Sequence, residues 1–535
     1  MAFGFRWKMG DYVGGDTAVH QAYKPWLALD PDDWAIGEVN IAARDTTDLV
    51  FNGLGFEPDV LFLISYRPQN ANGGSDSAFG ARGGGMSYGA AGRACPGIEQ
   101  WSGSTKIRHA FEENYSGWRE DCCLHVLHDN GVEVLRLVLD SFDADGFTLQ
   151  QAINLYDQTN YVAWLAMKGR FRVGVMDAGT TELTGIPGTP QAAVFISTKH
   201  RTSDGPRRTG YWHHMQGFAT PSAQASIWGG GKPTSWNWTT ERWHDEDAII
   251  MCTSASSSFF AGATLDQRAQ VTAWNADQDT VTITRSGTTA TVAHTGHGFS
   301  SGQCIEISGA LQTPYNGAHE ITVTGLNEYT YTVSGSPTSP ATGDIKATVG
   351  SVDLQWYLFD NEPWRIGYVL SGDAADSGVL ETNWETRQGG AQNDFSDNSN
   401  WVPTAIQPRV VLMQATNYNF SWSNSDPFDS PRAPETFGFG GSGGLGWHAQ
   451  PFSDLGYDAY GVHTFGNAVA ERGHYSNSGT QYMRRYILAG QGSNSNPPAY
   501  HQHSVNIIPN PRIVGMNWRY AERHISATRA LTGEN

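Results

Sequence analysis

Short apolar runs dominate this 535-residue chain, and each ends in Gly, Pro, Asn or Asp after about ten residues. This spacing is typical of strands joined by turns, and it predicts an all-β sandwich protein. Helical periodicity is almost absent. The one helical candidate runs from Asp16 to Leu29 and is interrupted by Pro25.

Three β segments follow one plan, which predicts three tandem β-sandwich domains of jelly-roll type. Each segment opens with an apolar strand, at 34–45, 170–180 and 364–374. A strongly apolar strand that is preceded by Pro comes next, at 55–65, 188–198 and 406–416. An aromatic strand closes each segment, at 161–169, 354–362 and 513–521. The Pro fits the start of a strand, because it fixes φ where no ladder hydrogen bond is lost.

Residues 279–350 interrupt the middle segment. They begin DTVTITRSGTTATVAHTGHGF, and the host pattern resumes with SVDLQWYLFD at 351–360. An inserted domain is tolerated where the host loop is exposed and its ends lie close together. We therefore expect a small β domain at 279–350, carried by the second sandwich.

The predicted organisation has six parts. They are an N-terminal docking arm (1–33), a first sandwich (34–169), a second sandwich (170–278 and 351–363), the insert (279–350), a third sandwich (364–521) and a basic C-terminal tail (522–535). Trp7, Tyr23 and Trp26 are expected to anchor the arm on a neighbouring subunit. The tail is either solvated or a basic foot that docks on an acidic partner.

Charge and cysteine usage exclude several classes of function. The chain has 34 Lys and Arg against 53 Asp and Glu, a net charge of −19 that repels nucleic-acid phosphates. Its five cysteines include no C-x-x-C pair, so we expect no disulfide framework and no zinc site, as in a protein assembled in the reducing bacterial cytoplasm. No apolar run is long enough to cross a bilayer, and no signal peptide is recognisable, so membrane insertion is not expected.

Two parts of the chain resemble bacteriophage proteins. EPDVLFLISYR (57–67), ADGFTL (144–149) and TNYVAWLAMKG (159–169) are similar to the concanavalin-like jelly-roll modules of phage tail fibres and other virion proteins. In the insert, TATVAHTGHGF, IEISGA, YNGAHEITV and YTYTVSGSP resemble the small immunoglobulin-like modules of tailed-phage virion proteins. The resemblance implies a virion component with an immunoglobulin-like insert, and it carries no fixed catalytic set.

Exposed aromatic residues are the main candidates for binding. They are Trp228, Trp236, Trp238, Trp243, Trp401 and Trp422. Aromatic rings bind sugar faces and anchor protein interfaces, although core or loop packing is the simpler role for any single tryptophan. Only Asn237 separates Trp236 from Trp238, so the two rings would share one face of an extended segment.

Metal ligands are sparse, and we expect neither a metal nor another cofactor. His501 and His503 would face the same way in an extended chain, and the spacing is similar to that of the H-x-H pairs that hold iron in some trimeric phage fibres. The pair occurs only once here. Asp30, Asp32 and Asp33 form an acidic cluster that fits turn chemistry better than a Ca²⁺ site.

Three functions follow from these features. G-x-S-x-G, H-E-x-x-H and P-loop signatures are missing from the sequence, so we expect a non-enzyme: a tail-associated virion protein that attaches to the host surface by binding. Its expected partners are other virion proteins and a host glycan or protein, with self-association into a homo-oligomer such as a trimer. The alternatives are a purely architectural decoration of capsid or tail, and a glycan-degrading tail enzyme whose acids converge in the fold.

Overall fold

The computed structural model is all-β, as the sequence predicts. It describes residues 3–9, 20–42, 44–66, 79–88, 92–101, 115–127, 133–155, 160–197, 204–208, 212–233, 238–247, 249–253, 265–358, 365–384, 400–417, 420–423, 436–441, 447–451, 470–475 and 481–488. Within these ranges the strands form several antiparallel sheets arranged as sandwiches.

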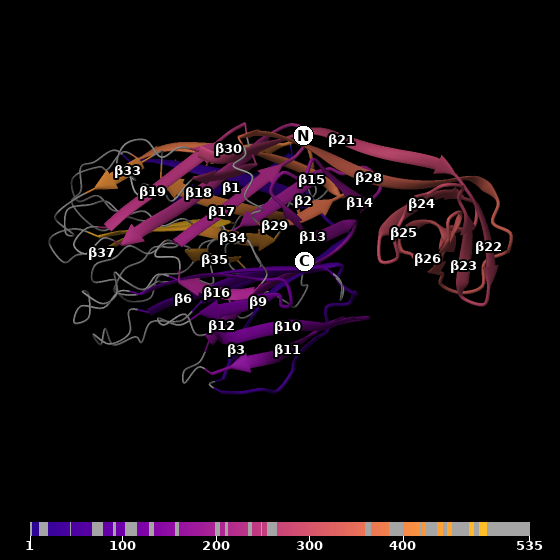
Figure 1. The fold of residues 1–535 in the computed structure, drawn as a ribbon, viewed down its shortest axis with the longest axis horizontal. Helices are drawn as coiled ribbons and strands as arrows, with labels where there is room; N and C mark the ends of the chain where they lie inside the picture. Colours follow the sequence, from indigo (N-terminus) through magenta and orange to yellow (C-terminus); the bar gives the residue numbers. More distant parts are fainter. Residues whose placement is uncertain are drawn as a thin grey trace, which may run out of the picture.

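The first sandwich packs a seven-stranded sheet on a four-stranded one. The larger sheet has the order β16 (Asp204–Arg208), β8 (Tyr115–Arg119), β7 (Gly92–Trp101), β6 (Phe79–Tyr88), β5 (Val60–Tyr66), β12 (Asn160–Lys168) and β3 (Asp33–Ile41). The smaller sheet has the order β4 (Leu49–Asn52), β11 (Gly146–Asn154), β10 (Glu133–Asp143) and β9 (Leu124–Leu127). Figure 1 shows this sandwich at the bottom of the molecule.

The second sandwich repeats this arrangement. Its larger sheet has the order β13 (Phe171–Asp177), β29 (Arg365–Ser371), β15 (Ala192–Ser197), β17 (Trp212–Ala219), β18 (Gln224–Pro233), β19 (Trp238–Asp245) and β33 (Phe420–Ser423). The facing sheet contains β20 (Ile250–Thr253), β21 (Leu265–Thr280), β28 (Gly343–Leu358) and β14 (Glu182–Pro187).

The third sandwich is built from both ends of the described chain. One sheet has the order β30 (Ala374–Trp384), β2 (His20–Asp30), β32 (Val410–Asn417), β34 (Thr436–Gly441) and β35 (Trp447–Pro451). The other has the order β31 (Asn400–Thr404), β1 (Phe3–Met9), β37 (Gln481–Leu488) and β36 (Ala470–Tyr475).

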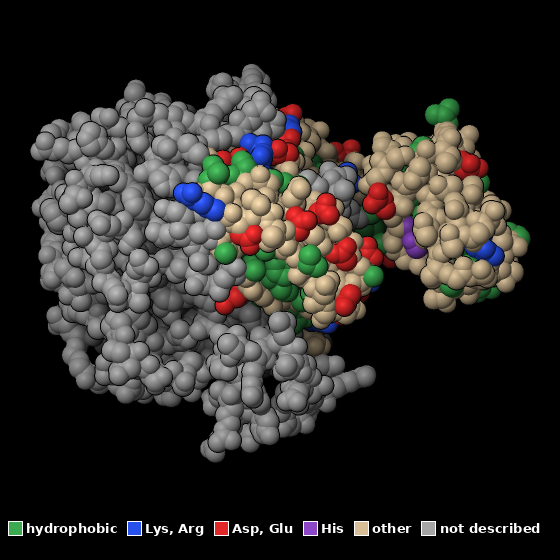
Figure 2. Space-filling view, turned by 90° about the horizontal axis from the view of Figure 1, so that it is seen from below, with side chains coloured by type: hydrophobic (Ala, Val, Ile, Leu, Met, Phe, Trp, Pro, Cys, Tyr) green, Lys and Arg blue, Asp and Glu red, His purple; other side chains and the backbone are tan. Residues whose placement is uncertain are grey.

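The insert has a core of its own and is carried by the two longest strands, β21 and β28 (Figure 1). One of its sheets has the order β22 (Thr282–Ser286), β23 (Thr289–Ala293), β27 (Glu328–Thr332) and β26 (Thr322–Gly325). Its other strands, β24 (Cys304–Ala310) and β25 (Gly317–Glu320), extend the sheet of β28, and a single 3-10 turn, η1 (Thr313–Tyr315), joins them. Figure 2 shows the insert as a separate lobe beside the body.

Strand order shows that a strand near the start of the sequence lies at the centre of the third sandwich's larger sheet. We call the seven-stranded sheets of the first two sandwiches and the five-stranded sheet of the third the large sheets. In each of them, one strand lies between the strand that opens the repeat and the strand that a Pro precedes. These central strands are β12, between β3 and β5, β29, between β13 and β15, and β2, between β30 and β32. Residues from the start of the chain therefore complete the third sandwich, and the prediction that residues 1–33 are a separate docking arm is wrong. The helix expected at 16–29 is also wrong, since β2 covers His20–Asp30.

Two other strand assignments need correction. Residues 365–371 form β29, the central strand of the second sandwich, and not the opening strand of the third. The third sandwich opens with β30 instead. Residues 354–358, expected to close the second sandwich, are the end of β28 in its outer sheet. The predicted closing strand at 513–521 and the tail at 522–535 lie outside the described residues.

The three sandwiches share one central core. Its members from the three large sheets include Ile36, Val60, Phe62, Leu165, Met167, Phe171, Val173, Val194, Ile196, Val369, Leu27, Leu29, Val410, Leu412 and Phe439. Strand β12 shows how one strand serves two cores. Ala163 and Leu165 face the central core, whereas Val162, Trp164 and Ala166 face the first sandwich's own core. Because alternate residues point to opposite faces, a strand buried on both faces is apolar throughout.

An aromatic ring packed against a glycine recurs in all three large sheets. The cross-strand pairs are Trp164 with Gly37, Tyr368 with Gly174 and Trp26 with Gly378. At each glycine an added Cβ would overlap the aromatic side chain. The glycine thus leaves room for the ring of the neighbouring strand, and the pair marks equivalent positions in the three repeats.

Candidate functional site

Four of the six tryptophans proposed for binding lie on three adjacent strands, β18, β19 and β33. Trp228 in β18 is the register partner of Trp243 in β19. Trp238 is the first residue of β19, and Trp422 in β33 pairs with Thr240. Strand β33 follows β32 of the third sandwich in the chain, yet it joins the edge of the second sandwich's sheet. We call β18, β19 and β33 the tryptophan strands.

The other two binding candidates are not part of this group. Trp401 lies in β31, where it pairs with Arg6 of β1, in a different sheet. Trp236 lies outside the described residues, as do the weak metal candidates His501 and His503.

The three proposed docking residues belong to strands inside the third sandwich. Trp7 lies in β1, which is paired on both sides, by β31 and β37. Tyr23 lies in β2 between β30 and β32. Trp26 is only 5% exposed because its ring packs over Gly378. The docking role predicted for Trp26 is therefore wrong: a side chain buried between strands of its own chain cannot anchor on a neighbouring subunit.

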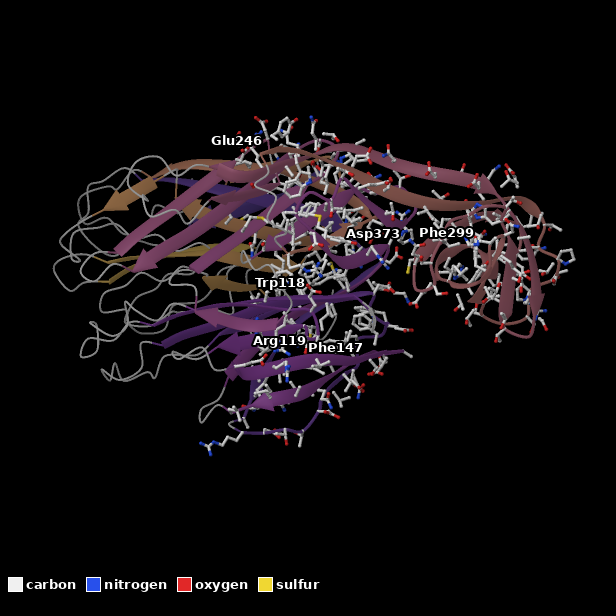
Figure 3. The ribbon with its side chains drawn as sticks, viewed as in Figure 1. Trp118, Arg119, Phe147, Glu246, Phe299 and Asp373 are labelled. Carbon is white, nitrogen blue, oxygen red and sulfur yellow. The ribbon has the colours of Figure 1, made fainter. Side chains whose placement is uncertain are left out.

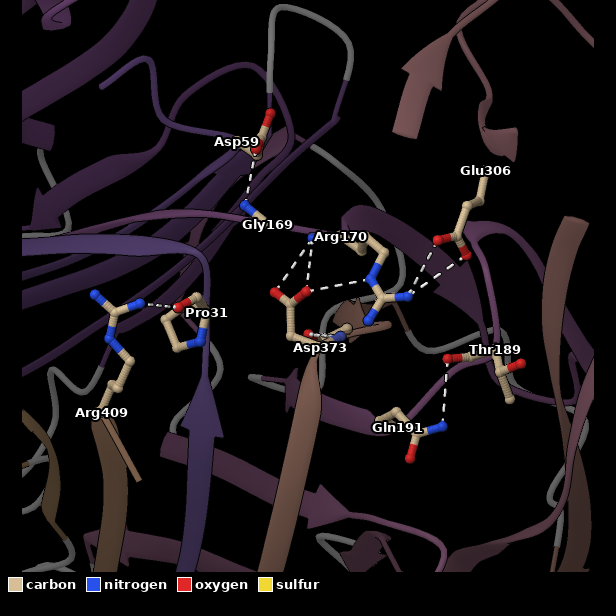
Figure 4. Close-up of polar contacts among 10 residues, drawn as sticks. Pro31, Asp59, Gly169, Arg170, Thr189, Gln191, Glu306, Asp373 and Arg409 are labelled. Carbon is tan, nitrogen blue, oxygen red and sulfur yellow. Dashed lines mark hydrogen bonds and ion pairs between the residues drawn. The ribbon is translucent and has the colours of Figure 1, made fainter. Parts of the chain in front are cut away.

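On the side of the body that faces the insert (Figure 3), short turns join consecutive sandwiches, at 31–32, 169–170 and 372–373. We call these three turns the hub (Figure 4). Beside each turn lies the residue that follows the Pro at the start of β5, β15 or β32. These residues are Asp59, Gln191 and Arg409, and their amides donate hydrogen bonds to Met167 (2.8 Å), Ser371 (2.7 Å) and Leu29 (2.9 Å), respectively. The backbone pattern repeats three times, whereas the side chain changes from acidic to neutral to basic.

Asp59 binds the turn between the first and second sandwiches. Its Oδ2 accepts a hydrogen bond from the Gly169 amide at 2.9 Å. Burial raises the pKa of Asp59 to about 6, although the Gly169 amide and Lys168 act in the opposite direction. The carboxylate therefore stabilises the turn geometry at the expense of keeping a charge in a poorly solvated place.

Asp373 occupies the turn between the second and third sandwiches. Its carboxylate accepts hydrogen bonds from the Arg170 amide, at 3.1 and 3.2 Å, and from Arg170 Nε at 3.4 Å. Burial raises its pKa to about 6 against the lowering effect of Arg170. Asp373 thereby ties the second junction to the first.

Arg409 takes the position of Asp59 in the third repeat. Its Nη1 donates hydrogen bonds to the carbonyl oxygens of Pro31 (2.6 Å) and Asp32 (2.5 Å). These contacts hold the turn that follows β2. Burial raises the pKa of Asp30 in the same region, while the charge of Arg409 lowers it.

The hub side chains bind backbone groups of the turns, which is the chemistry of a structural joint. Within the described ranges no group of three or more His, Cys, Asp or Glu side chains is arranged to hold a metal ion. The acidic residues at 30–33 flank the first hub turn, with Asp30 at the end of β2 and Asp33 at the start of β3. The hub fixes how the sandwiches meet, so the tryptophan strands are the better candidate for contact with a partner.

The hub was not predicted, although the sequence holds two signals for it. One is the residue after each Pro at 58, 190 and 408. The other is the likeness between YVAWLAMKG at 161–169 and YKPWLALDP at 23–31, which share Tyr, Trp, Leu and Ala at the same spacing. Both segments turn out to be central strands that run into a hub turn.

No family model matches this chain, and no curated protein matches it. Among the residues placed by the structure, no helix is long and apolar enough to cross a membrane. The architecture itself is thus the main guide to function.

Proposed function

We propose that this chain is a structural component of a tailed-bacteriophage virion, associated with the tail, that attaches to the host surface by binding without turnover. The sequence resemblance of residues 57–67, 159–169 and the insert to phage virion modules supports the setting. One observation supports the binding role: the tryptophan strands and the insert lie at opposite ends of the molecule (Figure 1). Such a body can be fixed at one end and present a surface at the other.

Rigidity supports binding by a preformed surface. Strand β16 joins the first sandwich's sheet through β8, although it follows β15 of the second. Arg365 of the second sandwich donates to both oxygens of Glu120 in the first, at 2.6 and 2.7 Å, and also to Asp177. Exchanged strands and a bidentate ion pair hold the sandwiches in one arrangement, so little conformational entropy is lost on binding. Several copies on one particle would multiply a weak single-site affinity.

Adsorption to bacterial cells tests this proposal. The purified chain, fluorescently labelled, is expected to bind cells of a susceptible strain and to slow infection when added in excess. A variant with Trp228→Ala and Trp243→Ala is expected to lose most of this binding while keeping its thermal unfolding transition. Trp401→Ala is the matched control, since Trp401 lies in another sheet. Equal losses in both variants would reject the tryptophan strands as the contact surface.

The same experiment separates the alternatives. A chain that binds no cells, and that antibody labelling places on capsid or tail tube, is an architectural decoration. New reducing ends after incubation with surface polysaccharide would identify a glycan-degrading enzyme and end the binding-only proposal. Measurement of particle mass in solution checks the homo-oligomer, which stays a prediction.

A further inference from the structure

We propose that Arg170 locks the insert at one fixed angle to the three-sandwich body, so that the insert is an arm with a locked and a released state. Arg170 lies in the hub turn between the first two sandwiches, and its guanidinium reaches out of the hub to the insert (Figure 4). This inference concerns the arm alone and does not depend on the function proposed above.

One guanidinium connects three distant parts of the chain. Arg170 Nη1 lies 3.4 Å from Glu306 Oε2 in β24 of the insert, and Arg170 Nε lies 3.4 Å from Asp373 Oδ1 in the hub. The Asp373 side chain is 5% exposed and Glu306 is 29% exposed, so the pair is partly shielded from water. Since Asp373 also binds the Arg170 amide, the arginine is held from its backbone side while its tip holds the insert.

The surroundings of this ion pair leave room for the Glu306 carboxylate. Gly188 has φ +74°, and an added Cβ there would overlap Glu306 Oε2 and come within 3.2 Å of Arg170 Nη1. A second arginine acts beside the first: Arg172 Nη1 donates to the Gly302 carbonyl of the insert at 3.2 Å. Both arginines belong to the body and both acceptors to the insert, so these contacts cross the junction.

Without those contacts the connection is a ribbon of two strands. β21 and β28 stay paired from the body into the insert, with Asp277 opposite Val349 and Thr280 opposite Lys346. On the other side of β28, β14 of the body pairs up to Val349 and β24 of the insert begins at Thr348. The neighbour of β28 thus changes from β14 to β24 between Val349 and Thr348, so only β21 and β28 run unbroken across the junction, and a two-stranded ribbon alone is a weak support. Figure 3 shows Phe299 on the side of the insert that faces Asp373 and the body.

Amide hydrogen exchange measures directly whether the contacts of Arg170 hold the insert in place. The Gly188 amide donates to the Thr348 carbonyl across the junction, at 3.5 Å, and release of the insert breaks this bond. The Gly302 amide donates to Ile321 inside the insert and reports on the insert's own fold. In the full-length chain, Glu306→Ala is expected to speed exchange of peptides that contain Gly188 several-fold and to leave peptides that contain Gly302 unchanged.

Matched variants complete the test. Arg170→Ala is expected to act like Glu306→Ala, and the double variant should loosen the junction no further than either single change. Lys346→Ala is the control, because the ion pair of Lys346 is with Asp344 of its own strand, β28. The proposal is overturned if Glu306→Ala leaves Gly188 exchange at the wild-type rate, or if Lys346→Ala raises it equally. Glu306→Ala leaves the Arg170–Asp373 pair in place, so general unfolding of the hub would not account for its effect.

Discussion

Trp26 in β2 lies directly opposite Gly378 in β30, and its indole ring fills the space that a side chain at position 378 would need. The same relationship joins Trp164 to Gly37 in the first sandwich. The two pairs show that a strand from the start of the chain plays the same part in the third repeat as β12 plays in the first.

Enlarging these glycines should destabilise the fold. Gly37→Ala and Gly378→Ala each place a methyl group against a tryptophan ring, and overpacking of this kind costs about 1–3 kcal/mol in the free energy of unfolding. Urea unfolding followed by tryptophan fluorescence measures the loss. Gly325→Ala in β26 is the control, because an added Cβ meets nothing within 4 Å there. A loss in Gly325→Ala as large as in the other two would mean that glycine itself, and not the packing, is responsible.

Loss of the first two strands should prevent folding of the third sandwich. A chain that begins at residue 31 lacks β1 and the central strand β2, and its unpaired sheets expose apolar surface. We expect aggregation on expression, and partial recovery of soluble protein when a peptide of residues 1–30 is added during refolding. If the shortened chain were soluble with an unchanged melting transition, residues 1–30 would be a separate N-terminal docking arm and not part of the third sandwich.

Truncation of the buried indole tests the same point with a smaller change. Trp26→Ala removes a fully packed ring and should lower the free energy of unfolding by about 3–5 kcal/mol. Tyr357→Ala is the comparison, since Tyr357 is 47% exposed and its removal should have little effect. Similar midpoints for both variants in urea would contradict burial of Trp26.

The hub should make stability depend on pH in a direction unusual for carboxylates. Burial raises the pKa of Asp59 from 3.8 to about 6, so the folded state binds the proton more tightly than the unfolded state does. The group's contribution to stability is therefore fully present below pH 3.8 and is lost as the pH rises through about 6. At pH 7.5 this pKa shift corresponds to about 3 kcal/mol of lost unfolding free energy. Asp59→Asn should restore this stability, because the asparagine side chain is neutral and still offers an oxygen acceptor for the Gly169 amide.

A second carboxylate supplies the control for this measurement. The Arg119 guanidinium holds the pKa of Asp121 below its ordinary value, so Asp121 contributes stability at neutral pH that is lost on acidification. Asp121→Asn should therefore destabilise at pH 7.5 and become neutral at low pH, opposite to Asp59→Asn. The contribution of Asp121 is lost only below its ordinary pKa of 3.8, so unfolding midpoints from about pH 2 to pH 8 compare the two variants, and parallel curves would reject the burial effect at Asp59.

Removal of the insert should leave the body folded. Thr280 and Lys346 are register partners, so an Asn-Gly turn between them converts β21 and β28 into a hairpin like that of β10 and β11. The insert's core belongs to a cluster separate from those of the body. We expect a soluble protein whose circular dichroism melt matches that of the full chain. A molten product would show that the body needs the insert.

Local features of the fold were predictable, and long-range ones were not. Turn residues after every short apolar run gave the all-β class, because strand ends depend on nearby residues. The role of β2 was missed since Pro25 suggested a broken helix, and only pairing with strands far along the chain makes it a central strand. Likewise the sequence WRIGYV looked like an opening strand with its own glycine, whereas register places Tyr368 over Gly174.

The grouping of the tryptophans shows the same limit. Trp228, Trp238 and Trp243 are close in sequence, and strands β18 and β19 bring them together as a hairpin. Trp422 joins them only because β33 crosses from one repeat to the sheet of another, which no local pattern encodes. Trp401 has a similar loop-like context in the sequence but lies in a separate sheet.

The position of β2 in the sequence also determines when it can pair during biosynthesis. β2 leaves the ribosome before its two neighbours: β30 follows roughly 340 residues later and β32 roughly 380 residues later, a delay on the order of tens of seconds at ordinary translation rates. A nascent chain must keep this apolar segment from aggregating until its partners are made. Prematurely terminated chains can never cover it, so they would be open to chaperones and proteases, and only chains that include β30 and β32 would fold.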